Sequence, residues 1–258
     1  MPAWRTDVKR KDSLIFMAIL LLGFGQLSAQ ELIFNTQDFA PFTYMNGDVV
    51  AGPAVDIIKA VCKEAGIAYS IRLLPWTRAQ DEVKKGTSHA LFLIGWNKER
   101  AETFYFSPPI LNTEYGIFVN ADSTLKYTTP VQLRGYTIGV YGPSNTSTSL
   151  DELKKKRPDI VVDMTPDDVA AFKKLELKRV SAVYSNRDVG AALISRLKLV
   201  NVRYAGTDKP LKYYIGFSKE FVDKAVFDRF VQAYKDLYAE GAIKKILDSY
   251  GLTIAALE

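Results

Sequence analysis

The stretch "WTRAQDEVKKGTSHALFLIG", residues 76–95, predicts an α/β fold class. Its first half has the spacing of an amphipathic helix, which ends at Gly86. A short polar turn then leads into the apolar run "HALFLIG". An apolar run of this length predicts a strand buried on both faces, as in a parallel sheet covered by helices. The stretch is therefore predicted to be the αβ half of a βαβ unit.

The neighbouring segments extend this pattern. Upstream, a strand, a helix and a second strand are predicted at residues 31–36, 52–66 and 68–75, which completes βαβαβ. The same order of elements returns between residues 136 and 206, with a helix over 149–158 that starts in a capping box of Ser149 and Glu152. We therefore expect an α/β protein of two lobes, each a mainly parallel sheet flanked by helices.

Two further extended segments, residues 114–122 and 212–220, are predicted to join the lobes as hinge strands. Lobe 1 is placed at residues 30–118 and 210–258, and lobe 2 at residues 119–209. Ligands of open α/β sheets bind beyond the carboxyl ends of the strands. We expect the cleft between the lobes to be lined by four loops, at residues 37–41, 95–100, 142–147 and 185–188.

Residues 1–29 have the three-part layout of a secretory signal peptide. Basic side chains come first, an apolar run follows from Leu14 to about Phe24, and small residues lead to Ala29. We expect cleavage near Ala29 and an exported product, with an uncleaved anchor as the alternative. Cys62 is the only cysteine, so an internal disulfide is impossible and the hydrophobic core must stabilise the fold.

Composition argues against several classes of function. One histidine, His89, and one cysteine exclude multi-histidine metal sites, and a Cys/His pair would depend on a thiol predicted to be buried. The sequence has no G-x4-G-K-[ST] phosphate loop. The net charge of +5 is spread along the chain, and its basic runs lie near predicted helix ends, where they complement the helix dipoles. We therefore predict a monomer with no cofactor, no metal and no nucleic-acid partner.

A set of short segments carries a family resemblance: "FAPFTY", "GPAVDIIKAV", "PWTRA" with the later "VKKG", "ERAETFYFSPPI", "LRGYTIGVYGPSN" and "YAEGAIKKILDSYG". In this order, residues 31–251 resemble the periplasmic solute-binding proteins of polar amino acid ABC uptake systems, extracellular solute-binding family 3. The resemblance implies a type II two-lobed fold that captures a small carboxylate-bearing solute, an amino acid or related organic acid. It also implies a periplasmic location and an inner-membrane ABC permease, or a receptor, as the partner.

The resemblance assigns roles to individual residues. Arg100 lies six residues before the "FS" of "FSPP", where the family has the arginine that clamps the ligand carboxylate, and a planar guanidinium suits that group. The alternative for Arg100 is an internal ion pair with Glu99 or Glu102. Phe39 matches an aromatic that packs on the ligand, with a core aromatic as the alternative. The helix-start loop that binds the other carboxylate oxygens matches Ser144, Asn145 and Thr146.

Two positions depart from the family pattern. Gly95 stands where members that bind α-amino acids have serine or threonine, and Asn186 stands where they have the aspartate that holds the α-ammonium group. An asparagine cannot neutralise a buried ammonium group, so Asp38 or Asp188 would have to compensate. The departures put an α-amino acid ligand in question.

Trp76, Trp96 and Arg78 are further candidates for the cleft or its rim. Arg78 is predicted either to hold a second anionic group or to be a solvated surface charge. Our main hypothesis is a binding protein without enzymatic activity. The alternatives are a periplasmic enzyme on the same scaffold, such as a dehydratase, which would need a positioned acid or base, and an orphan sensory binding protein.

Overall fold

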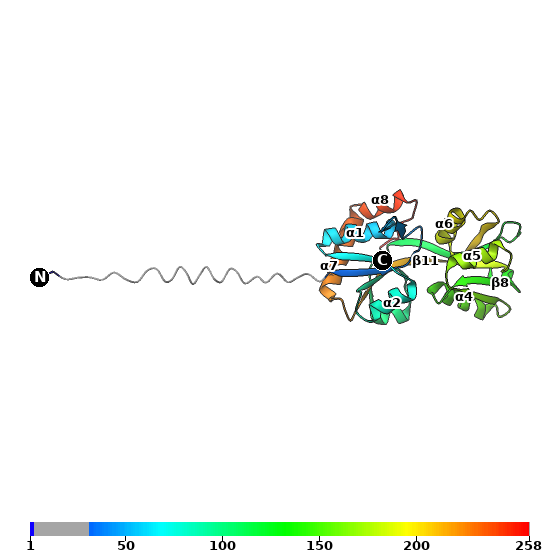
Figure 1. Cartoon of the computed structure of the whole chain (residues 1–258), viewed down its shortest axis with the longest axis horizontal. Coiled ribbons are helices and arrows are strands. Elements are labelled where there is room, and N and C mark those ends of the chain that lie inside the picture. Colours follow the sequence, from blue (N-terminus) through cyan, green and yellow to red (C-terminus); the bar gives the residue numbers. More distant parts are fainter. Residues whose placement is uncertain (3–30, 258) are drawn as a thin grey trace. The chain divides into compact units, whose positions relative to one another are not determined.

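The predicted βαβαβ unit opens lobe 1 of the computed structural model, which describes residues 1–2 and 31–257 (Figure 1). The predicted signal peptide, apart from its first two residues, lies outside the described residues. In the described part, no helix is both long and apolar enough to cross a membrane. Three parallel strands run in the order β4-β1-β5, with bounds Tyr69–Leu73, Leu32–Thr36 and Ala90–Gly95.

Helices cover both faces of the lobe 1 sheet, which is why every residue of β5 is buried. Helix α2 (Trp76–Lys84) packs Trp76, Ala79 and Val83 on one face. The other face is covered by α1 (Pro53–Ala65), α7 (Lys224–Ala239) and α8 (Ala242–Ser249), which contact one another. A small hairpin of β2 (Tyr44–Asn46) and β3 (Val49–Ala51) precedes α1.

Lobe 2 repeats the arrangement with three parallel strands in the order β10-β8-β9, with bounds Ala182–Asn186, Thr137–Tyr141 and Val161–Thr165. Its helices are α4 (Asn145–Lys156), α5 (Asp168–Glu176) and α6 (Arg187–Leu197), with a 3-10 turn η1 at Pro130–Leu133. The predicted start of α4 is wrong: Ser144 and Ser147 form the capping box, so the helix begins four residues before Ser149. This shift brings the helix start into the predicted loop 142–147.

Two long antiparallel strands, β7 (Leu111–Asn120) and β11 (Val202–Ser218), connect the lobes. They join both parallel sheets into one nine-stranded sheet of order β4-β1-β5-β11-β7-β10-β8-β9, with β6 (Phe104–Phe106) also paired to β11. The last predicted strand of the second unit, which ends at residue 206, and the predicted hinge strand at 212–220 are therefore a single strand. Register shifts at Tyr204/Gly206 and Thr207/Lys209 mark bulges, which let one strand bend from one lobe into the other.

Candidate functional site

The four predicted loops lie at the carboxyl ends of β1, β5, β8 and β10, where the two lobes face each other. Besides contacts made by the hinge strands, polar contacts between described residues cross the cleft. Tyr141 donates to Gln37 Oε1 (3.1 Å), Asn97 Nδ2 donates to Asn145 Oδ1 (3.5 Å), and Arg196 pairs with Asp38 (3.6 Å). Lobe 1 contributes Gln37, Asn97 and Asp38, and lobe 2 their partners. The lobes are thus in contact around the cleft.

Two cavities lie between the lobes, and Trp76 lies in the walls of both. The first, of about 830 Å³, is lined by Arg100 and Trp76 from lobe 1 and by Pro143, Ser144 and Asn145 from lobe 2. We call it the Arg100 cavity. The second, of about 680 Å³, is lined from lobe 1 by Phe39 and Trp76 and from lobe 2 by the start of α5 and one face of α6, and we call it the α5 cavity. Trp76 and Pro143 line both.

Arg100 lies in the short helix α3 (Lys98–Thr103), which is capped by the side chain of Asn97. Its Nη1 donates to the carbonyl of Gly95 at 2.9 Å, and its guanidinium carbon is 6.0 Å from the centre of the Trp76 ring. Burial lowers the pKa of Arg100 from its ordinary value. Within the described residues no carboxylate lies within 4.0 Å of Arg100. The alternative of an ion pair with Glu99 or Glu102 is therefore not realised, and other guanidinium donors remain for a ligand.

Two buried tyrosines from the hinge strands, Tyr115 of β7 and Tyr213 of β11, lie next to this guanidinium. Burial raises the pKa of each phenol, and hydrogen bonds of Tyr115 with Thr146 and Tyr213 oppose the shift at Tyr115. The Phe39 ring meets Tyr213 edge-on, with centroids 5.8 Å apart. Neither tyrosine was among the predicted site residues, although both lie in the segments predicted to cross between the lobes.

Asn186 is buried beneath the cleft and its amide is fully used. Its Oδ1 accepts from the backbone N–H groups of Asp188 (2.9 Å) and Val189 (3.1 Å), capping α6, and its Nδ2 donates to Thr113 (2.7 Å) and Tyr213 (3.3 Å). The amide oxygen considered as an ammonium acceptor is thus occupied. The two acids considered as alternative partners for an ammonium group already have partners of their own. Asp188 contacts Thr113 and Arg187, whereas Asp38 pairs with Arg196.

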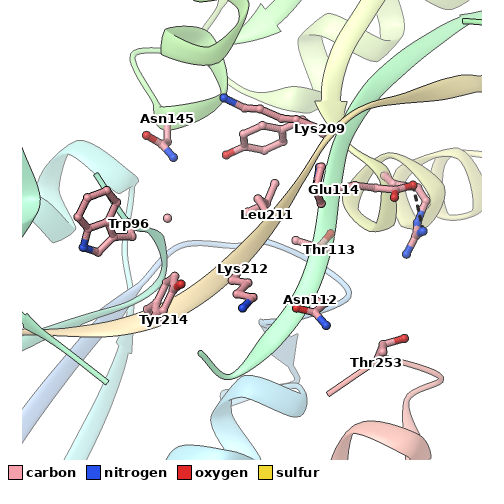
Figure 2. A pocket seen from close by; sticks show the side chains of 14 residues that line it. Trp96, Asn112, Thr113, Glu114, Asn145, Lys209, Leu211, Lys212, Tyr214 and Thr253 are labelled. Atoms are coloured by element: carbon pink, nitrogen blue, oxygen red, sulfur yellow. Dashed lines mark hydrogen bonds and ion pairs between the residues drawn. The ribbon is translucent and has the colours of Figure 1, made fainter. Parts of the chain in front are cut away.

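A third pocket, of about 690 Å³, lies along the hinge strands and is lined by Gly95, Trp96 and Asn145 (Figure 2). Figure 2 shows Trp96 and Asn145, which belong to opposite lobes, on the same side of this pocket. The Trp96 side chain is largely exposed, at 57%. Ser144 caps α4, and Thr146 in its first turn is buried. The start of α4 in lobe 2 therefore lies against the carboxyl end of β5 in lobe 1.

Asp168, which the sequence analysis did not select, opens on the α5 cavity. It follows the cap residue Asp167 at the start of α5, and its Oδ1 accepts from the buried Ser185 hydroxyl at 2.7 Å. Burial raises the pKa of the Asp168 carboxyl to about 6. The signal available in the sequence was the second acid of Pro166-Asp167-Asp168, directly after a predicted strand.

Comparison with known proteins identifies the family. The model of the bacterial extracellular solute-binding proteins, family 3, matches residues 32–253. This chain belongs to that family. It is similar to the "Probable amino-acid-binding protein YxeM" of Bacillus subtilis (strain 168), with 23% identity over 216 residues that cover 81% of this chain and 79% of that protein.

Solved structures of binding proteins share the fold of this family 3 protein. The arginine-, lysine-, histidine-binding protein ArtJ from Geobacillus stearothermophilus matches with a TM-score of 0.74 and 24% identity, over 87% of this chain and 96% of that chain. A histidine kinase sensor domain with similarity to periplasmic binding proteins matches with a TM-score of 0.78 and 20% identity, over 88% and 98%. These matches confirm the predicted two-lobed α/β class.

In this family 3 protein the predicted site residues, apart from Arg78, separate into four groups. Arg100, Trp76, Ser144 and Asn145 line the Arg100 cavity, and Phe39 lines the α5 cavity with Trp76. Gly95 and Trp96 line the third pocket, which lies along the hinge strands. Thr146 and Asn186 are buried beside the tyrosines.

Arg78 lies outside the three cavities. Its side chain is 67% exposed and forms an ion pair with Glu82 one turn along α2, at 2.9 Å. Of the two interpretations offered for Arg78, the structure favours the solvated surface charge. Cys62 lies in α1, where burial raises its thiol pKa to about 12. His89 lies directly before the first residue of β5, at the end of the strand that is farther from the cleft. Within the described residues, no group of three or more His, Cys, Asp and Glu side chains could hold a metal ion.

Proposed function

We propose that this family 3 protein captures a small carboxylate-bearing solute, an amino acid or a related organic acid, between its lobes and delivers it to an ABC uptake system in the periplasm. The observation that carries the proposal is Arg100, a partly buried cation in an interlobe cavity with no carboxylate of the described chain within reach. The family to which the chain belongs, and the amino-acid-binding name of its Bacillus relative, support a solute of this class.

Arg100 would bind the carboxylate through its guanidinium fork, because two parallel charge-assisted hydrogen bonds match the planar geometry of a carboxylate. The carbonyl of Gly95 and the Trp76 ring fix the guanidinium from lobe 1. From lobe 2, the first turn of α4 offers the N–H groups of Asn145 and Thr146, which have no acceptor inside the helix. A carboxylate held by both groups would draw the two lobes together.

Closure then follows from differential affinity. A solute that contacts both lobes stabilises the closed arrangement over the open one, and it can shift the equilibrium only by that difference. The rings of Phe39 and Trp76 would cover the rest of the solute and exclude water. The closed form is what a permease would recognise. Cys62 and His89, the only residues from which a Cys/His pair could be built, are not at the cleft, so the enzyme alternative gains no support from them.

The test is calorimetric titration of the full-length protein with a panel of amino acids, their deaminated keto and hydroxy analogues, and dicarboxylates. The variant Arg100→Ala is expected to lose about 100-fold or more in affinity for any solute that binds, because a buried charge loses its partner. Arg78→Ala is the matched control: it removes an arginine of the same lobe that is paired at the surface, and its affinity should equal that of the unmodified protein.

Both variants should unfold at the temperature of the unmodified protein, since neither removes a buried ion pair. Retained affinity in a folded Arg100→Ala variant would overturn the proposed function. So would the absence of binding by every solute of the panel.

A further inference from the structure

The walls of the α5 cavity carry an excess of negative charge. Its charged lining residues are Asp38, Asp167, Asp168 and Arg196. Arg196 and Asp38 form an ion pair at 3.6 Å, so their charges offset each other. The two aspartates at the start of α5 are left without a cation among the described residues.

The two aspartates differ in what they already do. Asp167 caps α5: its Oδ1 accepts from the backbone N–H of Ala170 at 2.6 Å, and the residue is exposed. Asp168 is partly buried, and its Oδ1 is held by the Ser185 hydroxyl at 2.7 Å. No donor of the described residues contacts its Oδ2 in the structure. A desolvated carboxylate with one oxygen fixed and the other open is costly unless a cation meets it.

Asp168 and Arg100 line two different cavities that share Trp76 in their walls. Arg100 lines the Arg100 cavity but not the α5 cavity, and for Asp168 the reverse holds. Both cavities include Trp76 and Pro143 in their walls. Arg100 and Asp168 also both interact electrostatically with the phenol of Tyr213. A solute whose carboxylate is held by Arg100 and which extends along Trp76 into the α5 cavity would present its far end to Asp168.

We propose that Asp168 is a specificity-determining residue, and that the solute carries an ammonium or guanidinium group at the end opposite its carboxylate. This inference rests on the proposed function, because it takes the carboxylate at Arg100 as the fixed end. The site then binds a dipolar molecule: each buried protein charge meets one charge of the solute, and the rings of Phe39 and Trp76 cover the apolar chain between them. Asp168 supplies a negative charge for the far end of the solute, a different position from that of Asn186, whose amide oxygen caps α6.

The test uses pairs of probes that differ only in the far group. L-Arginine is compared with L-citrulline, and L-lysine with L-norleucine, by calorimetric titration of the full-length protein. Both members of each pair keep the α-amino and α-carboxyl groups. We expect at least one cationic probe to bind about 30-fold or more tightly than its neutral counterpart, because the neutral probe leaves the Asp168 carboxylate without a cation.

The variant Asp168→Asn should abolish this preference by weakening the binding of the cationic probe, while its amide oxygen can still accept from Ser185. The matched control is Asp167→Asn, which removes a like charge from the adjacent residue of the same cavity and keeps a good capping side chain. Its preference should change by less than about threefold, because an exposed charge is screened.

Three results would overturn the inference while leaving the proposed function in place. The neutral probes could bind as tightly as the cationic ones, Asp168→Asn could keep the preference, or the panel solutes that bind could all lack a cationic far group. The loss of binding in Arg100→Ala tests the proposed function separately, so failure of one is distinguishable from failure of the other.

Discussion

Gly95 and Asn145 meet across the cleft so closely that there is no room for a side chain at position 95. A Cβ there would lie 2.4 Å from Asn145 Nδ2. Asn145 is held in this position by the hydrogen bond from Asn97 at 3.5 Å. The glycine that departs from the family pattern therefore allows the helix start of lobe 2 to approach the end of β5.

We predict that Gly95→Ala lowers the affinity for the solute about threefold to tenfold, because the Asn145 side chain must turn away and lose its hydrogen bond. Overall stability should change little, since the clash is with the end of a flexible side chain. Affinity is measured by calorimetry in the single variants and in Gly95→Ala/Asn145→Ala. In the Asn145→Ala background the alanine at 95 should cost nothing further; an equal loss in both backgrounds would contradict this account.

The second prediction concerns Asp168 and stability. Its pKa of about 6 in the folded protein exceeds the ordinary value of 3.8, so the folded state binds the proton more tightly than the unfolded state. Stability therefore falls as the pH rises from 3.8 to 6, and the full cost is present above pH 6. Without ligand, Asp168→Asn should raise the free energy of unfolding by about 1–3 kcal/mol near neutral pH.

The measurement is urea unfolding of both proteins at a series of pH values. The difference between them should shrink toward zero as the solution becomes more acidic than the ordinary aspartate pKa. The groups that face Asp168, namely Asp167 on its own helix, Tyr141 on β8 and Tyr213 on β11, stay in place in both proteins. A pH-independent difference would show that the substitution acts through packing instead.

The third prediction concerns Asp208 on β11, which accepts from two tyrosines of lobe 2. Tyr127 donates to Oδ1 at 2.6 Å and Tyr184 to Oδ2 at 2.7 Å, and burial with the nearby carboxylate holds the pKa of both phenols well above the usual range. In Asp208→Asn one phenol loses its acceptor, so the free energy of unfolding should fall by about 1–3 kcal/mol.

Chemical denaturation of this variant is compared with that of Asp122→Asn. Asp122 pairs with Lys178 at the surface, where both side chains are more than half exposed. This control should lie within about 0.5 kcal/mol of the unmodified protein. Equal losses in the two variants would mean that the contacts of Asp208 add nothing beyond an exposed pair.

The fourth prediction concerns the contact between Tyr141 and Gln37, which crosses from β8 to the loop after β1 at 3.1 Å. In Tyr141→Phe the closed arrangement loses one hydrogen bond while the ring remains. We expect a larger radius of gyration by small-angle X-ray scattering without ligand, and an affinity lower by about twofold to tenfold. Tyr250→Phe removes a comparable bond, to Asp56 within lobe 1 at 2.8 Å, and should change neither quantity.

Much of the fold could be predicted because it depends on local pattern. The apolar run of β5 and the glycine that ends α1 identify their elements within a few residues. The start of α4 was misplaced because Ser144 and Ser149 are both acceptable caps, and only the path of the chain after β8 selects the first.

The site was less predictable because its residues meet only through tertiary structure. Tyr115 and Tyr213 come from β7 and β11, where Tyr115 is opposite Lys209 and Tyr213 is opposite Leu111, so strand pairing alone does not predict that their phenols interact. Asp168 reaches the cleft because α5 starts beside the hydroxyl of Ser185. The role of Asn186 depends on the orientation of its amide, which residue type alone does not determine. Arg100 could be found because the residues around it carry the family pattern.

Trp76 lies in the walls of both interlobe cavities and is only 8% exposed, whereas Trp96 is open to solvent. Indole emission depends on the polarity around the ring, and a solute bound in either cavity would replace water beside Trp76. In a Trp96→Phe background, Trp76 is the one tryptophan left among the described residues. The protein therefore contains its own optical reporter at the point where the two cavities meet, and unlabelled solutes can be screened by the colour and intensity of its emission.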